Sequence, residues 1–220
     1  MTKRLIVLDT ETTGLDVENG HRIIEVGCVE IIDRNITNNF FHCYINPERL
    51  IDEQAYQVHG ISNEFLSDKP KFMQVVEKFI DYIEDSTLVI HNAPFDLGFL
   101  REEYKLCGFD TDKLEGARSV YDTLKMARKK SPGKRNTLDA LCSRYSIDNT
   151  ERDLHGALLD AQLLAKVYLK MTQGQTAILG LSESVAKMDI ESTGTVKRRA
   201  PVIHYADKDE IDLHEKYFLR

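Results

Sequence analysis

The stretch of sequence that decides the fold covers residues 5–14 and reads Leu-Ile-Val-Leu-Asp-Thr-Glu-Thr-Thr-Gly. Its first four residues are apolar, which predicts a strand buried on both faces. Asp9 and Glu11 follow the apolar run, and the two-residue period of a strand points both carboxylates to the same side. They repel each other unless a cation lies between them, and a hard divalent cation with oxygen ligands suits that place. A solvated acidic turn is the alternative interpretation.

The composition of the 220 residues is typical of a soluble globular protein, since 42% are apolar and 30% are charged. This length allows one substantial domain and an additional segment. No apolar run approaches the roughly 20 residues that cross a bilayer, and the first strand begins too early to leave room for a signal peptide. The four cysteines are scattered and predict reduced thiols. We therefore expect a cytoplasmic protein with no membrane contact.

The net charge of −7 argues against a protein that coats nucleic acid through charge alone. It permits an enzyme that holds a few nucleotides through bound metal ions. One segment has the opposite charge, with basic residues at Lys125, Arg128, Lys129, Lys130, Lys134 and Arg135. This segment is either a solvated loop or a loop that faces phosphates.

The spacing of apolar residues predicts strands in the first part of the chain and helices later. Strands are expected at 5–8, 22–32, 40–45 and 88–90, and helices at 72–83, 94–104, 138–145 and 156–171. Glu25 lies inside the second strand, either paired with a neighbour or on a wetter face. A meander followed by alternating helices and strands predicts an α/β fold with a mixed sheet. Residues 172–195 are rich in Gly, Ser, Thr and Gln and predict a linker or mobile tail.

Two further acidic residues lie at places where a carboxylate needs an explanation. Asp96 falls in the first turn of a helix, where it could simply complement the helix dipole. Asp160 falls within an apolar helical run, where a carboxylate is costly unless it is paired or bound to a metal ion. His155 would lie about 140° from Asp160 around an ideal helix, so we expect it on a loop before the helix and not on the same face.

Three motifs follow one another along about 150 residues. Each motif alone is common enough to occur by chance, but the three in this order are not. They are Asp-x-Glu-Thr-Thr-Gly with Asp9 and Glu11, Asn-Ala-x-Phe-Asp with Asp96, and His-x-x-x-x-Asp with His155 and Asp160. Together they resemble the DEDDh 3′→5′ exonucleases of the DnaQ-like superfamily. The resemblance implies a ribonuclease H-like mixed sheet of five strands flanked by helices, with a flexible C-terminal tail.

The resemblance also implies a mechanism and its cofactors. Asp9, Glu11 and Asp160 would hold one Mg²⁺ or Mn²⁺ ion, Asp9 would also serve a second ion, and Asp96 would act through water. His155 would be the general base that deprotonates the attacking water. Nucleotides would leave a 3′ end one at a time as 5′-monophosphates.

Residues 54–61 resemble the segment that covers the terminal nucleotide in this family, so the substrate-binding residues implied are Asp9, Glu11, Gln54, His59 and Asp160. Gln54 stands where related proofreading subunits often carry Glu. His59 could instead cap the turn before Gly60. Thr10, Thr12 and Leu15 would line the sugar and base pocket, whereas Phe99 is expected in the core.

Within the superfamily, the end of the chain is similar to that of the proofreading (epsilon) subunits of bacterial DNA polymerase III. The resemblance implies an exonuclease domain at 1–172, a flexible linker at 173–200 and a polymerase-docking peptide at 201–220, which would bind the polymerase (alpha) subunit. Residues 175–181 would bind the sliding clamp weakly, since Gly180 occupies the usual aromatic position.

The function expected is therefore a proofreading 3′→5′ exonuclease subunit acting on DNA 3′ ends. A stand-alone DEDDh exonuclease that trims RNA or single-stranded DNA fits the three motifs equally well. A non-catalytic scaffold between polymerase and clamp is the alternative of another class, although all five chemical residues are present.

Overall fold

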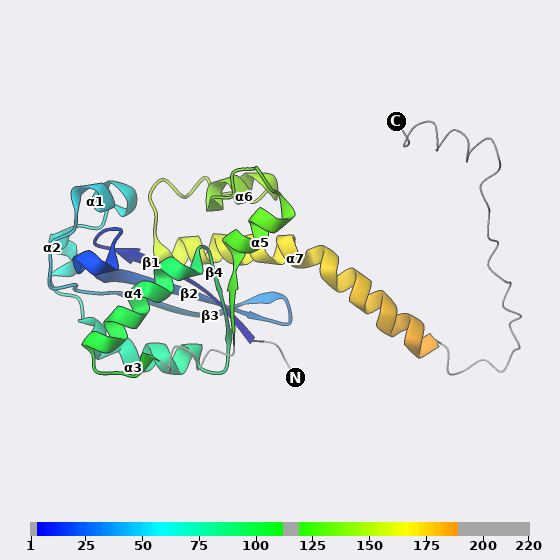
Figure 1. Ribbon diagram of the computed structural model, residues 1–220, viewed down its shortest axis with the longest axis horizontal. Helices are drawn as coiled ribbons and strands as arrows, with labels where there is room; N and C mark the ends of the chain where they lie inside the picture. Colours follow the sequence, from blue (N-terminus) through cyan, green and yellow to red (C-terminus); the bar gives the residue numbers. More distant parts are fainter. Residues whose placement is uncertain (1–3, 112–118, 189–220) are drawn as a thin grey trace, which may run out of the picture. The chain divides into compact units, whose positions relative to one another are not determined.

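The computed structural model describes residues 4–111 and 119–188, with side chains described as far as residue 173. The chain divides into two compact units, Met1–Ala177 and Ile178–Arg220, and the sheet and the site lie in the first. The sheet has five strands in the order β3-β2-β1-β4-β5 (Figure 1). They are β1 (Arg4–Thr12), β2 (Ile23–Ile32), β3 (Asn35–Tyr44), β4 (Thr87–Ile90) and β5 (Ser119–Asp122).

The central strand β1 makes the sheet mixed, because it pairs antiparallel with β2 and parallel with β4. Its apolar residues are buried on both faces, as predicted. Ile6 and Leu8 belong to one core cluster and Leu5 and Val7 to another, which is the two-residue period of a strand. The predicted α/β fold with a five-stranded mixed sheet is confirmed.

Helices cover both faces of the sheet (Figure 1). They are α1 (Glu53–His59), α2 (Asn63–Leu66), α3 (Phe72–Ile83), α4 (Ala93–Leu106), α5 (Thr123–Lys130), α6 (Leu138–Arg144) and α7 (Ala157–Met188), with a 3-10 turn η1 at Val17–Asn19. The predicted apolar stripe of α3 packs with α4 on one face, and Phe99 of α4 is buried there as expected. The described part of α7 packs with α5 and α6 on the other face.

Three features bring the acidic residues to one edge of the sheet. Because β1 and β4 run parallel, their carboxyl ends meet at the same edge. Asn92 turns the chain sharply from β4 into α4 with a left-handed backbone (φ 67°), and Pro94 occupies the first turn of the helix. Gly27 of β2 lets the backbone of α7 approach, since a Cβ atom there would lie 2.3 Å from the backbone carbon of Ala157.

Some elements differ from the sequence-based predictions. β5 and α5 were not predicted from the sequence. β5 has only four residues and no buried apolar run, and it is a strand because it pairs in parallel with β4. The helix predicted to end at residue 171 continues to Met188, so the first part of the predicted linker, 173–188, is helical. That segment contains no proline, and a helix tolerates its isolated glycines. The rest of the linker and the predicted docking peptide lie outside the described residues.

Among the helices of the described ranges, none has the length and apolar character needed to cross a membrane.

Candidate active site

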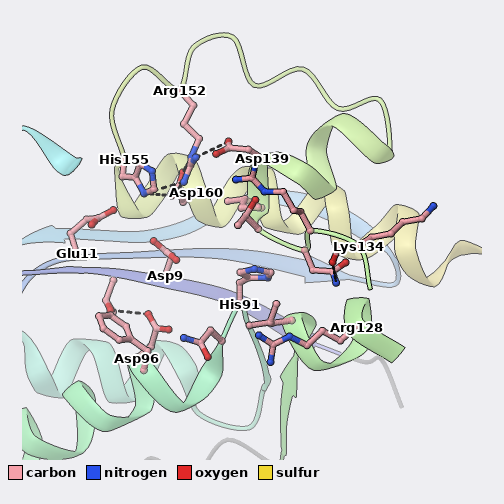
Figure 2. Close-up of a pocket in the computed structure, with 18 of the residues that line it drawn as sticks. Asp9, Glu11, His91, Asp96, Arg128, Lys134, Asp139, Arg152, His155 and Asp160 are labelled. Atoms are coloured by element: carbon pink, nitrogen blue, oxygen red, sulfur yellow. Dashed lines mark hydrogen bonds and ion pairs between the residues drawn. The ribbon is translucent and has the colours of Figure 1, made fainter. Parts of the chain in front are cut away.

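Four acidic side chains and a histidine converge on one pocket of about 940 Å³ (Figure 2). Asp9 and Glu11 come from β1, Asp96 from α4 and Asp160 from the first turn of α7, while His155 lies on the loop before that helix. The structure therefore brings together all five residues of the three sequence motifs. The placement of His155 on a loop agrees with the prediction.

The carboxylates repel one another, and burial adds to the cost of their charges. Burial, followed by the charges of Asp96, Glu11 and Asp160, raises the pKa of Asp9 well above its ordinary value. Burial and the charge of Asp160 raise the pKa of Glu11 to about 8. Burial raises the pKa of Asp96 to about 7, although Thr10 Oγ1 donates a hydrogen bond of 2.8 Å to Asp96 Oδ1. Burial and mutual repulsion therefore oppose full ionisation of Asp9, Glu11 and Asp96 at neutral pH.

The donor set fits a divalent cation. Glu11, His155 and Asp160 each offer one ligand atom, and these atoms lie within 4.8 Å of one another. Carboxylate oxygens are the ligands that Mg²⁺ and Mn²⁺ prefer. Asp9 and Asp96 line the same pocket and add two more carboxylates, and Asp9 lies between Asp96 and the pair Glu11 and Asp160 (Figure 2).

A further acidic residue lies beside Glu11 on the neighbouring strand. Glu25 of β2 is the register partner of Glu11 on β1 and is 2% exposed. Its Oε1 pairs with Nε2 of His42 on β3 at 2.7 Å, whereas Oε2 has no hydrogen-bond partner among the described residues. Glu25 is thus paired with a neighbour, one of its two predicted environments, and it adds to the charge that raises the pKa of Glu11.

His155 approaches Asp160 although it does not share a helix face with it. The loop of residues 145–156 turns back over the start of α7, and the backbone N–H of His155 donates to the carbonyl of Val58 at 3.1 Å. This places Nδ1 of His155 3.7 Å from Oδ2 of Asp160. Burial, then the charge of Arg152, lowers the pKa of His155, so its imidazole is neutral at pH 7.

Arg152 is the residue of the site that sequence reasoning missed. Its Nε and Nη2 donate to the two oxygens of Asp160, Nη1 donates to Asp139 of α6, and Nη2 also lies 3.1 Å from Nδ1 of His155 (Figure 2). Nothing in the local sequence distinguishes this arginine from other loop arginines, because its partners come from α6 and α7.

A second cavity of about 460 Å³ adjoins the site and shares Thr10 and Glu11 with it. Its walls include the residues expected around sugar and base, namely Thr12, Leu15, Gln54 and His59. His59 caps the turn, since its Nδ1 accepts a hydrogen bond from the N–H of Ile61. The proton therefore lies on Nε2, which has no partner among the described residues.

The basic segment also reaches the main pocket. Its first part forms α5 and its last part a turn, so the prediction of a loop is wrong for residues 125–130. Arg128, Lys134 and Arg135 line the pocket that holds the carboxylates. Part of the segment thus faces the site.

Comparison with known proteins gives consistent results. The profile of the exonuclease family RNase_T matches residues 6–168. DNA polymerase III subunit epsilon of Salmonella typhimurium is 50% identical over 222 residues, covering 96% of this chain and 90% of that protein. The structure of exonuclease X in complex with 5′ overhanging duplex DNA is similar to this one, with a TM-score of 0.59 at 27% identity. The matched region covers 77% of this chain and 92% of the exonuclease X chain. The nuclease domain of 3′hExo, a DEDDh family member bound to rAMP, shares the fold, with a TM-score of 0.68 at 21% identity. The matched region covers 79% of this chain and 93% of the 3′hExo chain.

The matched region begins in β1, where Asp9 and Glu11 lie, and ends in α7, beyond Asp160. It therefore contains the complete pocket described above. The chain belongs to the RNase_T family of exonucleases and, within it, to the family of DNA polymerase III epsilon subunits.

Proposed function

We propose that the chain is the proofreading 3′→5′ exonuclease subunit of a DNA polymerase III. It would remove mispaired 3′-terminal nucleotides from DNA as 5′-monophosphates. The observation that carries this proposal is the convergence of Asp9, Glu11, Asp96, Asp160 and His155 on one pocket. The identity to an epsilon subunit over 96% of the chain supports DNA as the substrate and a polymerase complex as the setting.

Asp9, Glu11 and Asp160 are proposed to hold one Mg²⁺ or Mn²⁺ ion, with Asp9 also serving a second ion and Asp96 acting through water. Such a pair of ions would stabilise the attacking and the leaving oxygen of the scissile phosphate. The raised pKa values of Asp9 and Glu11 support this assignment, because a bound cation relieves the repulsion that raises them.

His155 is proposed as the general base. Its lowered pKa keeps the imidazole neutral and able to accept the proton of the attacking water at pH 7. The side chain is 44% exposed and lies beside Asp160, which is a suitable position for a group that passes protons between the site and solvent. Its place on a loop allows small adjustments when substrate binds.

The adjoining cavity is proposed to receive the 3′-terminal nucleotide. Nε2 of His59 is a buried donor without a partner among the described residues, and it suits an oxygen of the terminal sugar. Gln54 lines the same cavity and would contact the sugar, while Leu15, which is 80% exposed, would lie against the base. Asp9, Glu11 and Asp160 would contact the substrate through the ions.

The basic residues at the other end of the main pocket are proposed to bind the phosphates of the preceding nucleotides. Arg128, Lys134 and Arg135 place three positive charges along the wall of a pocket whose floor is acidic. This arrangement would guide a strand so that its last phosphate meets the carboxylates. Frayed or mispaired ends would be preferred because unpairing costs them least.

The partners proposed beyond DNA belong to the end of the chain. Residues 201–220 would dock on the polymerase (alpha) subunit, and residues 175–181 would bind the sliding clamp weakly. A linker between two such peptides raises the effective concentration of the exonuclease at the primer end. As a polymerase subunit, the protein would act in the cytoplasm.

The test is degradation of a 5′-labelled DNA primer with a mispaired 3′ end in Mg²⁺, beside an RNA oligonucleotide of the same sequence and a His155→Ala control. Preferential loss of single nucleotides from the DNA 3′ end, abolished in the control, is the expected result. Preferential trimming of RNA would instead favour a stand-alone ribonuclease. Absence of cleavage of either substrate, with metal ions bound, would leave a non-catalytic scaffold as the remaining interpretation of the function.

A further inference from the structure

Arg152 occupies the position of a cation within the carboxylate pocket. Its guanidinium donates to Asp160 Oδ1 at 2.5 Å and to Asp160 Oδ2 at 2.6 Å, a two-pronged ion pair in which each side chain is 5% exposed. A third bond of 2.7 Å reaches Asp139 Oδ1. Such forked, charge-assisted pairs are the strong ones, particularly where water is excluded.

This geometry sets Arg152 against a metal ion at Asp160. Both oxygens of Asp160 already accept N–H bonds from the guanidinium. A divalent cation coordinated by either oxygen would bring a second positive charge into contact with the first. Like charges at such a distance repel strongly in a buried site, so a metal ion and the guanidinium compete for Asp160 in this arrangement.

We infer that Arg152 is the internal counter-ion of Asp160, and that metal binding requires the forked Arg152–Asp160 pair to open. This inference rests on the metal site proposed above and adds a competitor to it. When no metal ion is bound, the guanidinium offsets the negative charge of the pocket. When an ion binds, the ion takes over that role and Arg152 leaves Asp160.

The opening also affects the general base. Nη2 of Arg152 lies 3.1 Å from Nδ1 of His155, so the closed pair holds the imidazole beside Asp160. Asp139 is 55% exposed and lies on α6, so it can keep hold of Arg152 after Asp160 is released. The guanidinium then has an alternative partner within reach, and His155 loses one of its contacts. Arg152 is thus a positioning residue that couples metal binding to the placement of His155.

The experiment measures Mn²⁺ binding to the full chain, by the free-ion electron paramagnetic resonance signal and by calorimetry, without any nucleic acid. The variants are Arg152→Gln, which removes the charge, and Arg152→Lys, which keeps the charge but not the fork. Arg128→Gln is the matched control, because it removes a positive charge from the opposite side of the same pocket (Figure 2).

Arg152→Gln is expected to tighten Mn²⁺ binding by about 5- to 150-fold, the usual range for a coupling between two sites. Arg152→Lys should tighten it less, and Arg128→Gln should change it least, because that charge is not in contact with Asp160. A role in structure alone would give wild-type affinity in every variant.

Unfolding by urea provides a second readout. Arg152→Gln should lower the midpoint in EDTA, and saturating Mn²⁺ should bring it back toward that of the wild type, since the ion replaces the lost counter-ion. If Arg152→Gln does not fold, Arg152→Lys carries both measurements.

Equal or weaker Mn²⁺ binding in Arg152→Gln or Arg152→Lys would overturn the inference and leave the proposed function intact. Equal tightening in Arg128→Gln would also overturn it, because the effect would then be one of pocket charge in general. Absence of Mn²⁺ binding in the wild type and in all variants would overturn the metal site itself.

Discussion

Replacing Glu11 by Gln is expected to stabilise the metal-free protein at pH 7 and above, and to have a smaller effect at pH 5. Glu11 is 8% exposed, and burial together with Asp160 and Glu25 raises its pKa from 4.5 to about 8. A carboxyl group whose pKa rises on folding binds its proton more tightly in the folded state. The stability that it contributes is therefore fully present below pH 4.5 and is lost as the pH rises through 8.

The magnitude follows from the two pKa values. The raised pKa of Glu11 lowers the free energy of unfolding by about 3 kcal/mol at pH 7 but by only about 1 kcal/mol at pH 5, because the unfolded state, with a pKa of 4.5, has released its proton while the folded state, with a pKa of about 8, still holds it. Glu11→Gln has no proton to lose at this position. Its advantage in free energy of unfolding over the wild type should therefore grow by up to about 2.5 kcal/mol between pH 5 and pH 7.

The assay is urea unfolding followed by circular dichroism in EDTA at pH 5, 6, 7 and 8. Glu53→Gln, which removes an exposed carboxylate from α1, is the control and should behave as the wild type does. Saturating Mn²⁺ should reduce the advantage of Glu11→Gln, because the ion stabilises the ionised carboxylates of the wild type. If Glu11→Gln and the wild type change in parallel from pH 5 to pH 8, the account of the strained carboxylate cluster is refuted.

Three further predictions concern other parts of the site and its support. His155→Ala should lower kcat for removal of a 3′-terminal nucleotide by about 10²- to 10⁴-fold with a smaller change in KM, and steady-state kinetics will show whether binding falls instead. Gly27→Ala should lower the free energy of unfolding in urea by about 1–3 kcal/mol and also reduce activity, because the added Cβ atom would clash with the α7 backbone at Ala157. An unfolding free energy equal to that of the wild type would contradict this prediction. Arg22→Gln should lower the free energy of unfolding by about 3–5 kcal/mol, because it leaves the carboxylate of Glu103, whose side chain is 2% exposed, without the two N–H donors of Arg22. An unchanged urea midpoint would contradict this prediction.

The sequence predicted those parts of the site whose reasons are local. Asp9 and Glu11 are set by the period of a buried strand, and Asp160 is conspicuous as a carboxylate within an apolar helical run. Asp96 has a good local explanation of its own, so only the combination of three motifs gave it a role. The parallel pairing of β1 and β4 brings Asp96 to Asp9 and Glu11, whereas Asp160 reaches them because the backbone of α7 approaches Gly27 of β2.

The missed parts depend on partners that are distant in the chain. β5 is short and partly exposed, and it is a strand because β4 offers a free parallel edge. Arg152 finds Asp160 and Asp139 on two different helices, and Glu25 faces Glu11 only in the observed register of β1 and β2. Neither composition nor periodicity contains this information, because both describe one segment at a time.

The fold gathers negative charge at a place where several elements of the described chain end together. The parallel edge of β1 and β4, the first turn of α4 and the first turn of α7 all end at the same pocket, and each contributes a carboxylate. Without a cation, that arrangement opposes folding, as the raised pKa values of Asp9, Glu11 and Asp96 indicate. Rigid sites that cost stability are expected where binding or catalysis needs a preorganised set of charges. A pocket of this kind binds a divalent ion strongly because the ion removes a repulsion that the fold has already imposed, and Arg152 offsets part of that repulsion at Asp160 until the ion binds.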